Sequence, residues 1–352
     1  MRRAFWIVVI LAIAAGGGWF AAAWYLPYQG FAAPGVYVDI PHGASRRTIG
    51  RMLADQGVVR SRWAFEILAR FRDPRPLEAG EYFFDHAQTQ QAVLGAIASG
   101  RVFVIPLIVP EGYNMFDIAD VAQQQGLVTR DEFLAAAADP APILDLAPDA
   151  PNLEGFLFPA TYEFPRHVTG AQMVQAMVKK FREQWATIAP PDASPRPVDV
   201  KDVVTLASLV ERETPLESER PLVAGVFTNR LARKMPLECD PTVAYALALA
   251  GLSTGPLTDA DLHFRSPYNT YQNAGLPPGP ISNPGEASLR AALDPSPTDY
   301  FYFVANTEGG HFFSKTLAEQ NRNVARYRKL RAAQQSAAGA GSPATHVAPR
   351  PN

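Results

Sequence analysis

The chain has 352 residues, of which 47% are hydrophobic and 19% are charged, a composition typical of a folded protein of about two domains. The 32 lysines and arginines nearly balance the 34 aspartates and glutamates, and this balance argues against nucleic acid as a partner. The single cysteine, Cys239, excludes an intramolecular disulfide. Because no histidine or other base stands beside it in the sequence, we interpret Cys239 as a packed residue and not as a nucleophile.

The chain opens with an uncharged segment. Residues 4–26 carry no charge and are long enough to cross a hydrocarbon core of about 30 Å. Two arginines precede the segment, so the positive-inside rule predicts residues 1–3 in the cytoplasm and residues 28–352 outside it. A cleaved signal peptide is the alternative, but bulky Trp24 and Tyr25 are unsuited to a small-residue cleavage site. We therefore predict a retained single-pass membrane helix.

Two segments of the chain resemble one another at a constant offset. Each copy reads as a strand, a Pro-x-Gly turn and a helix with apolar residues at helical spacing. The strands are expected at 36–40 and 107–109. Between the copies the pattern predicts a second helix over 63–71, a strand after Gly80 and a helix near 93–98. The recurring residues are Pro41, Gly43, Ile49, Gln56, Gly57 and Val59 in the first copy and Pro110, Gly112, Ile118, Gln125, Gly126 and Val128 in the second.

The order of two helices between strands resembles a LysM module, a small βααβ fold that often holds N-acetylated glycans. We assign residues 36–105 to such a LysM-like module, with a plain spacer as the alternative. Residues 106–331 then form a mixed α/β catalytic region with its core at 198–331, after a turn-rich break at 190–197. The tail at 332–352 lacks apolar periodicity and is expected to be disordered. The predicted fold class is α+β.

The segment from Val203 to Pro215 carries the strongest chemical signal. It is apolar on nearly every face up to Val210, so a helix there would be deeply buried. Pro215 should end the helix, which leaves Glu211 and Glu213 in its last turn. Residues two apart on a helix are separated by about 200°, so at most one of these carboxyls can face a small site. The alternative is that both are solvated, although an acidic residue at a helix C-terminus is electrostatically unfavourable.

Helical rows favour Glu213 over Glu211. Glu213 continues the row of Leu206, Leu209 and Val210, whereas Glu211 continues a more polar row. Removal of water raises the pKa of a carboxyl, and the negative end of the helix dipole raises it further, which favours a protonated acid near neutral pH. The helical spacing thus favours Glu213 as the catalytic carboxyl and leaves Glu211 as an alternative.

Segments in this part of the chain resemble the YceG-like (MltG) family of endolytic murein transglycosylases. They are LASLVERET, ERPLVAGVFTNRL, LECDPTVAYAL, SPYNTYQNAGLPPGPISNPG and YFYFVANTEGGHFFSKTLAEQN, in family order. The segment LEGFLFPATY and the upstream strand–helix pattern extend the resemblance to nearly the whole chain after the anchor. Where the family commonly has a residue other than cysteine before Asp-Pro-Thr, this chain has Cys239.

The resemblance implies an enzyme of the bacterial plasma membrane whose main part is periplasmic. It implies cleavage of the bond between N-acetylmuramic acid and N-acetylglucosamine within nascent glycan strands, with 1,6-anhydro ends as product and strand termination as the consequence. Peptidoglycan glycan strands are the implied partner, and cell-wall synthases are candidate partners. No cofactor or metal is implied, and the sequence lacks the HExxH, P-loop and Gly-x-Ser-x-Gly motifs.

The resemblance also assigns site residues. Glu213 followed by threonine resembles the Glu-Ser or Glu-Thr step that closes the catalytic helix of lytic transglycosylases, so Glu213 is the implied sole general acid and base, with Glu211 as the fallback. The loop at 266–285, in which Asn and Tyr alternate with Gly and Pro, is expected to form a groove wall. For His311 a packed role is the alternative. The expected substrate-binding residues are Asp240, Thr242, Tyr268, Asn269, Thr270, Tyr271, Asn283 and His311.

Two other functions stay open. A hydrolytic muramidase would need a second carboxylate, for which Glu238 and Asp240 are the candidates, and would leave a reducing sugar in place of an anhydro ring. A noncatalytic, membrane-anchored scaffold would bind glycan strands without shortening them.

Overall fold

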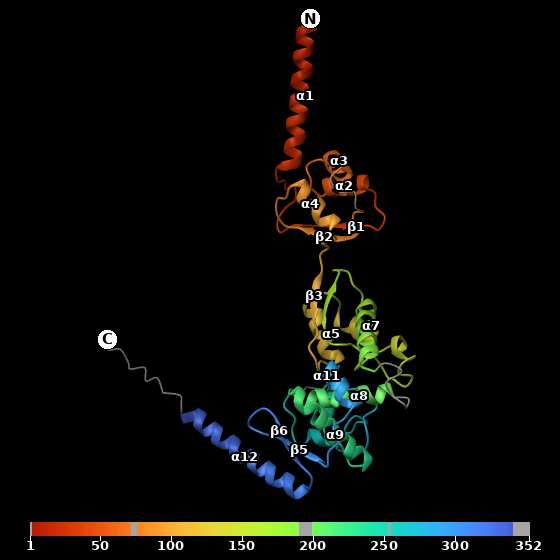
Figure 1. The fold of residues 1–352 in the computed structure, drawn as a ribbon, viewed down its shortest axis with the longest axis vertical. Helices are drawn as coiled ribbons and strands as arrows, with labels where there is room; N and C mark the ends of the chain where they lie inside the picture. Colours follow the sequence, from red (N-terminus) through yellow and green to blue (C-terminus); the bar gives the residue numbers. More distant parts are fainter. Residues whose placement is uncertain (1, 72–75, 190–198, 253–254, 341–352) are drawn as a thin grey trace, which may run out of the picture. The chain divides into compact units, whose positions relative to one another are not determined.

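The computed structural model describes residues 2–71, 76–189, 199–252 and 255–340 (Figure 1). The chain divides into two compact units between Ile105 and Pro106. Helices dominate both units, and the strands of the described residues pair as three separate two-stranded sheets, β1–β2, β3–β4 and β5–β6. The predicted α+β class is therefore confirmed. The break predicted at 190–197 lies outside the described residues.

The first unit holds the N-terminal helix and a small module. The order of elements in the module is strand, helix, helix, strand, helix, which matches the prediction for this region. The elements are α1 (Arg2–Tyr25), β1 (Val36–Ile40), α2 (Arg46–Asp55), α3 (Arg62–Phe71), β2 (Gly80–Phe84) and α4 (Gln90–Ala98).

Helix α1 is apolar along its length. Among the described residues, one helix is long and apolar enough to cross a membrane, and it covers Phe5–Tyr25 with a mean hydropathy of 2.1. A signal sequence near an N-terminus has the same length and composition. The predicted N-terminal apolar helix is thus confirmed, whereas its retention in the mature protein stays a prediction.

The module of the first unit packs around an apolar core. Strands β1 and β2 pair antiparallel, with Val38 opposite Tyr82, and both of these side chains are buried. Helices α2 and α3 contribute Leu53 and Leu68 to the same core, and α4 contributes Ile97. Buried residues recur at every second position on the strands and at helical spacing on the helices, and the sequence predicted the helical spacing.

The internal repeat is visible in the backbone. In both copies a strand leads through a turn into a helix, and the turn glycines Gly43 and Gly112 have φ of 73° and 79°. Each helix is followed by a second glycine, Gly57 or Gly126, with φ of 72° and 71°. Glycine is the residue that adopts this left-handed conformation at low cost after a helix C-terminus. The two copies therefore share their turns and helix ends as well as their order of elements.

The second unit holds the remaining elements. They are β3 (Ile105–Ile108), whose first residue belongs to the first unit, α5 (Met115–Gln124), α6 (Arg130–Ala137), β4 (Thr161–Phe164), α7 (Gly170–Ile188), α8 (Val200–Glu213), α9 (Arg220–Ala232), α10 (Asp240–Leu249), α11 (Glu286–Leu293), β5 (Tyr302–Ala305), β6 (His311–Ser314) and α12 (Leu317–Ala340), with short 3-10 turns η1 (Ala141–Ile143), η2 (Glu217–Glu219) and η3 (Asp261–His263).

Helix α8 is the buried centre of its part of the second unit. It packs against α9, α10 and α11, and every residue from Val204 to Val210 is buried. Asp199 caps its N-terminus by accepting a hydrogen bond from the backbone N–H of Asp202. The deep burial that the sequence predicted for this helix is confirmed.

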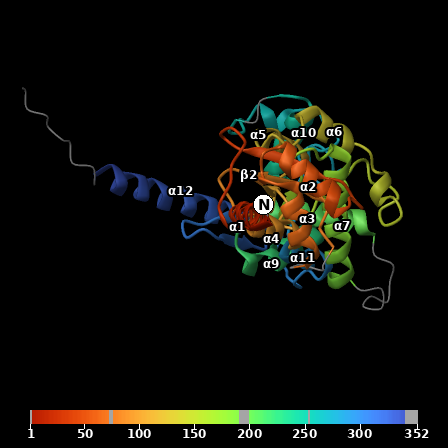
Figure 2. The same ribbon diagram turned by 90° about the horizontal axis from the view of Figure 1, so that it is seen from above.

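The C-terminal helix differs from the prediction. Residues 332–352 were expected to be disordered, but α12 continues to Ala340, and Figures 1 and 2 show it projecting from the rest of its unit. The lack of apolar periodicity does not test helix propensity. Alanine, arginine and glutamine are strong helix formers, and they dominate 331–340. Residues 341–352 lie outside the described residues.

Candidate active site

The end of α8 sets the position of its two glutamates. The helix stops at Glu213, and its C-cap residue Thr214 has the extended backbone that a following proline favours. The N–H of Thr214 donates to the Val210 carbonyl at 3.3 Å, which closes the last turn. Pro215 therefore ends the helix where the sequence predicted. Glu211 and Glu213 both lie in the last turn and point in different directions.

Glu211 lies inside the protein beside an arginine. Its carboxylate is 2.9 Å from a guanidinium nitrogen of Arg220, and the two side chains are only 4% and 5% exposed. The backbone N–H of Gly285 donates to the same carboxylate at 3.0 Å. Burial raises the pKa of Glu211, and the Gly285 N–H and the Arg220 charge oppose that rise. Glu211 thus ties α8 to α9 and to the loop before α11.

Glu213 faces a cavity of about 590 Å³ within the second unit. The cavity brings together Glu213, Asp240, Tyr271 and His311, which the sequence analysis had selected from segments far apart in the chain. Glu238, a candidate second carboxylate of the muramidase alternative, also lines the cavity. The other wall residues were not assigned to the site by the sequence analysis, and they are Arg230, Leu237, Tyr302, Phe303, Val304, Ala305, Leu317 and Gln320.

The surroundings of Glu213 favour its protonated form. Burial is the largest cause and raises the pKa of Glu213, and the negative charge of Asp240 raises it further. The thiol of Cys239, His311 and Arg230 oppose this rise without cancelling it. A carboxyl with a raised pKa at a cavity wall can donate a proton to a bound molecule and later take one back.

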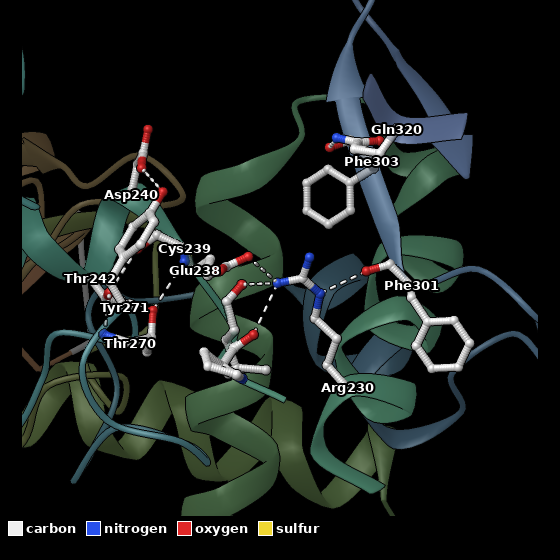
Figure 3. Close-up of polar contacts among 12 residues, drawn as sticks. Arg230, Glu238, Cys239, Asp240, Thr242, Thr270, Tyr271, Phe301, Phe303 and Gln320 are labelled. Atoms are coloured by element: carbon white, nitrogen blue, oxygen red, sulfur yellow. Dashed lines mark hydrogen bonds and ion pairs between the residues drawn. The ribbon is translucent and has the colours of Figure 1, made fainter. Parts of the chain in front are cut away.

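Arg230 organises the loop that leads to α10 (Figure 3). One of its terminal nitrogens donates to the carbonyls of Pro236 and Leu237 at 2.9 and 3.0 Å and to the Glu238 carboxylate at 3.0 Å. Its Nε donates to the Phe301 carbonyl at 2.7 Å, which joins the loop to the segment before β5. Glu238 has a φ of 51°, a conformation that residues other than glycine rarely adopt and that clusters at functional sites.

Asp240 and Tyr271 form a polar pair on the cavity wall. The Tyr271 hydroxyl donates to the Asp240 carboxylate at 2.6 Å, and Figure 3 shows this bond beside the loop. Burial raises the pKa of the Tyr271 hydroxyl, and the neighbouring Asp240 raises it further. The pair joins the N-terminus of α10 to the loop at 266–285, so that loop does contribute one wall residue to the cavity.

His311 is held by Glu219, a residue that the sequence analysis did not select. The backbone N–H and Nδ1 of His311 lie 2.9 and 2.7 Å from the two carboxylate oxygens of Glu219. The Thr214 hydroxyl donates to the same carboxylate at 3.2 Å. Burial alone would raise the pKa of Glu219, but the hydrogen bonds and charge of His311 outweigh it and lower the pKa. Glu219 therefore connects the end of α8 to β6.

Thr242 and Thr270 were expected to contact substrate, and the structure places both of them away from the cavity. Both are buried, their hydroxyls are 2.9 Å apart, and neither lines the cavity. The Thr270 hydroxyl accepts from the Cys239 N–H at 3.0 Å, and the Thr242 hydroxyl donates to the Cys239 carbonyl at 2.6 Å. These threonines hold the backbone of Cys239, which precedes Asp240, and their polar groups are used within the protein.

Asn269, Asn283 and Tyr268 also lie apart from the cavity that Glu213 borders. Asn269 is buried and donates to the carbonyls of Leu262 and Phe264 at 3.0 and 2.8 Å. Asn283 is buried and bonds to Tyr113, Leu157 and Glu154. The Tyr268 ring packs 5.1 Å from that of Tyr245. Both amides form hydrogen bonds within the protein, and these bonds fix the conformation of the loop.

Comparison with known proteins places the chain in a family. The sequence profile of the YceG-like family matches residues 38–326. The endolytic murein transglycosylase of Bacillus subtilis strain 168 is 34% identical over 308 residues, which cover 83% of this chain and 84% of that protein. The chain belongs to the YceG-like family.

Two further relatives support this membership. The endolytic murein transglycosylase of Streptococcus pneumoniae (strain D39 / NCTC 7466) is 31% identical over 357 residues, which cover 91% of this chain and 64% of that protein. A crystal structure of a putative yceG-like protein from Listeria monocytogenes is 34% identical, covers 82% of this chain and 98% of its own, and has a TM-score of 0.52.

The family match covers the candidate site in full. It begins in β1 and ends in α12, so it extends over parts of both units and contains every residue of the Glu213 cavity, and it leaves out α1. Within the described residues, no group of three or more His, Cys, Asp or Glu side chains is arranged to hold a metal ion.

Proposed function

We propose that this YceG-like chain is an endolytic murein transglycosylase that cuts glycan strands between N-acetylmuramic acid and N-acetylglucosamine. The observation that carries the proposal is the Glu213 carboxyl, whose pKa is raised by burial and which borders a cavity large enough to hold sugar rings. The names of the bacillar and streptococcal relatives agree with this activity. Release of 1,6-anhydro ends within nascent strands would terminate their elongation.

In the proposed mechanism Glu213 acts twice. As an acid it protonates the glycosidic oxygen while the bond from C1 of the muramic acid to that oxygen breaks. As a carboxylate it then takes the proton of the C6 hydroxyl while that oxygen bonds to C1 and closes the anhydro ring. The proton count balances, Glu213 ends in its starting state, and water is not consumed.

The other wall residues are proposed to bind and orient the sugars. Asp240 and Tyr271 offer a hydrogen-bonding edge, and Tyr302 and Phe303 offer rings for stacking. His311 lines the same cavity with its ring fixed by Glu219. Orientation is the effect expected of such groups, since a bound sugar held near the reactive geometry needs less activation.

The two other carboxylates at the cavity are engaged by neighbours. Glu238 is paired with Arg230, and Asp240 accepts from Tyr271. A hydrolytic muramidase needs a second carboxylate that activates water or attacks C1, and these partners stabilise both groups as acceptors of existing hydrogen bonds. The arrangement therefore favours the transglycosylase over the hydrolase.

Product analysis tests the proposal. The full chain, purified in detergent, is incubated with peptidoglycan sacculi, and the soluble and residual glycans are analysed by mass spectrometry. We expect 1,6-anhydro ends inside former long strands. Reducing ends in their place would indicate the muramidase, and strand binding without shortening at any pH would indicate the scaffold.

We further propose that α1 is a retained anchor, with residues 1–3 in the cytoplasm and residues 28–352 in the periplasm. The apolar length of α1 and the arginines before it support this topology. A reporter fused after Asn352 should be active only outside the cytoplasm. Activity only inside it would contradict the topology. The anchor would also keep the enzyme near cell-wall synthases.

The module at 36–105 is proposed to act as a LysM-like holder of glycan, and its order of strand, helix, helix and strand supports this. Its removal should weaken turnover of long strands more than turnover of short oligosaccharides. Equal loss on both substrates would indicate that the module belongs to the catalytic fold.

A further inference from the structure

Helix α3 exposes a row of large apolar side chains. Trp63, Ile67 and Phe71 are 53%, 41% and 77% exposed, although the helix belongs to the packed module of the first unit. Single exposed apolar residues are ordinary on protein surfaces, but a continuous row indicates an interaction surface. The adjoining part of α3 is buried in the module through Ala64, Phe65, Leu68 and Ala69.

The row lies on one side of α3. Residues four apart on a helix differ by about 40° in direction, so Trp63, Ile67 and Phe71 span about 80°. The buried residues continue the apolar surface from the edge of this row. The apolar face of α3 is thus wider than the part that the module covers. This pattern is typical of a helix that also contacts a second apolar partner.

Arginines border the exposed row. The guanidinium carbons of Arg62 and Arg47 lie 4.8 and 5.8 Å from the centre of the Trp63 ring. Arg70 is exposed next to Phe71 at the other end of the helix. An apolar stripe with tryptophan and a basic border is typical of helices that lie in the interface of a membrane with anionic lipids.

The place of α3 in its unit fits a membrane surface. The backbones of α1 and α3 come within 8 Å of each other, and Ala23 near the end of α1 is buried while Trp24 packs on the module core. Figure 1 shows α3 at the end of the first unit from which α1 extends, with β1 and β2 at the other end. A span formed by α1 would therefore place α3 close to the surface of the bilayer.

We propose that α3 docks on the outer face of the membrane that α1 spans. Trp63, Ile67 and Phe71 enter the region between lipid headgroups and acyl chains, and Arg47, Arg62 and Arg70 contact lipid phosphates. The proposal rests on α1 being a retained membrane span. Docking would hold the first unit at a fixed height on the bilayer in place of free rotation about the end of α1.

Spin labels measure this contact in the full chain. Phe71→Cys is labelled, reconstituted in vesicles that contain phosphatidylglycerol, and compared with Asp39→Cys, whose site is exposed on β1 at the far end of the unit. We expect label 71 to be accessible to oxygen and at least severalfold less accessible than label 39 to a water-soluble nickel chelate. Wild-type chain treated with the same reagent controls for reaction of buried Cys239. If Phe71→Cys fails to fold, Ile67→Cys replaces it.

Each other result contradicts part of the proposal. Equal nickel access at positions 71 and 39 would overturn docking, and magnetic coupling between labels on two chains would assign the row to a second copy of this protein. Equal protection in vesicles of phosphatidylcholine alone would overturn the preference for anionic lipid that the arginines imply. The mass of the reconstituted chain shows whether α1 is present, so loss of the anchor is distinguished from failure of docking.

Discussion

The last turn of α8 carries two glutamates whose carboxyl groups have different surroundings. Glu211 meets a buried arginine and a backbone N–H, so its charge is compensated by fixed partners inside the protein. Glu213 borders a cavity, and its partners there oppose but do not cancel the effect of burial. The same residue type, two positions apart on one helix, can therefore stabilise the fold at one position and transfer protons at the other.

The largest effect is expected from Glu213→Gln. Glutamine keeps the size of the side chain but cannot donate or accept the proton, so kcat should fall by about 10² to 10⁴ while glycan binding remains. The measurement is the rate of anhydro-end formation, with binding to sacculi as the control for the fold. Near-normal product formation by this variant, with loss in Glu211→Gln, would move the assignment to Glu211; normal activity of both would contradict the proposed mechanism.

Glu211→Gln should act on stability first. It leaves the Arg220 charge buried without its main partner, and loss of one member of a buried pair costs about 3 to 5 kcal/mol. The lower end of that range is expected, because Glu111 remains 3.5 Å from Arg220. Denaturant unfolding measures the change, and the double variant with Arg220→Met should recover part of it. An unchanged free energy of unfolding would show that the pair is not structural.

Glu219→Gln should have a moderate effect on the chemistry. Glutamine cannot accept from both the N–H and the ring of His311 and from Thr214 as the carboxylate does, so the cavity wall near Glu213 loosens. Misplacement of catalytic groups lowers the rate, and a fall in kcat of about tenfold is expected. Glu217→Gln, an exposed change in the same turn, is the matched control. Equal rates for the two variants would argue against a positioning role.

The raised pKa of Glu213 predicts a dependence of stability on pH. The folded chain holds the Glu213 proton more tightly than the unfolded chain does, so the free energy of unfolding falls as pH rises from the ordinary glutamate range through the raised pKa. Glu213→Gln removes this term, so its Tm should exceed that of the wild type increasingly toward high pH. Activity that requires the protonated acid should decline over the same range. Parallel Tm curves would contradict the raised pKa.

The smallest effect is expected from Cys239→Ser. The Cys239 thiol opposes the rise in the pKa of Glu213, and a hydroxyl is a stronger donor than a thiol. The alkaline limb of the pH–rate profile should therefore move to lower pH. Cys239→Ala should move it in the opposite direction. The same shift in both variants would show that the thiol does not act through Glu213.

The sequence by itself determined the order of elements in the first module and the end of α8. The strand, turn and helix order of the first module, the left-handed glycines of the repeat and the stop of α8 before Pro215 follow from side-chain period and local backbone sterics. Such rules act over a few residues, so one chain contains all the information they need. The family motifs likewise selected the region of the site, because they are contiguous in sequence.

Only the tertiary structure decided which polar residues face the cavity. Polar residues such as Asn283 and Thr242 look available in the sequence, but each finds partners far away in the chain, and burial makes them structural groups. Arg230 lies in the cavity wall for the converse reason. Helix α9 brings it beside Glu238 and beside the segment before β5, and no local sequence pattern relates these two segments. The division between Glu211 and Glu213 has the same origin: helix geometry separates the two carboxyls, and distant segments supply Arg220 to one and a cavity to the other.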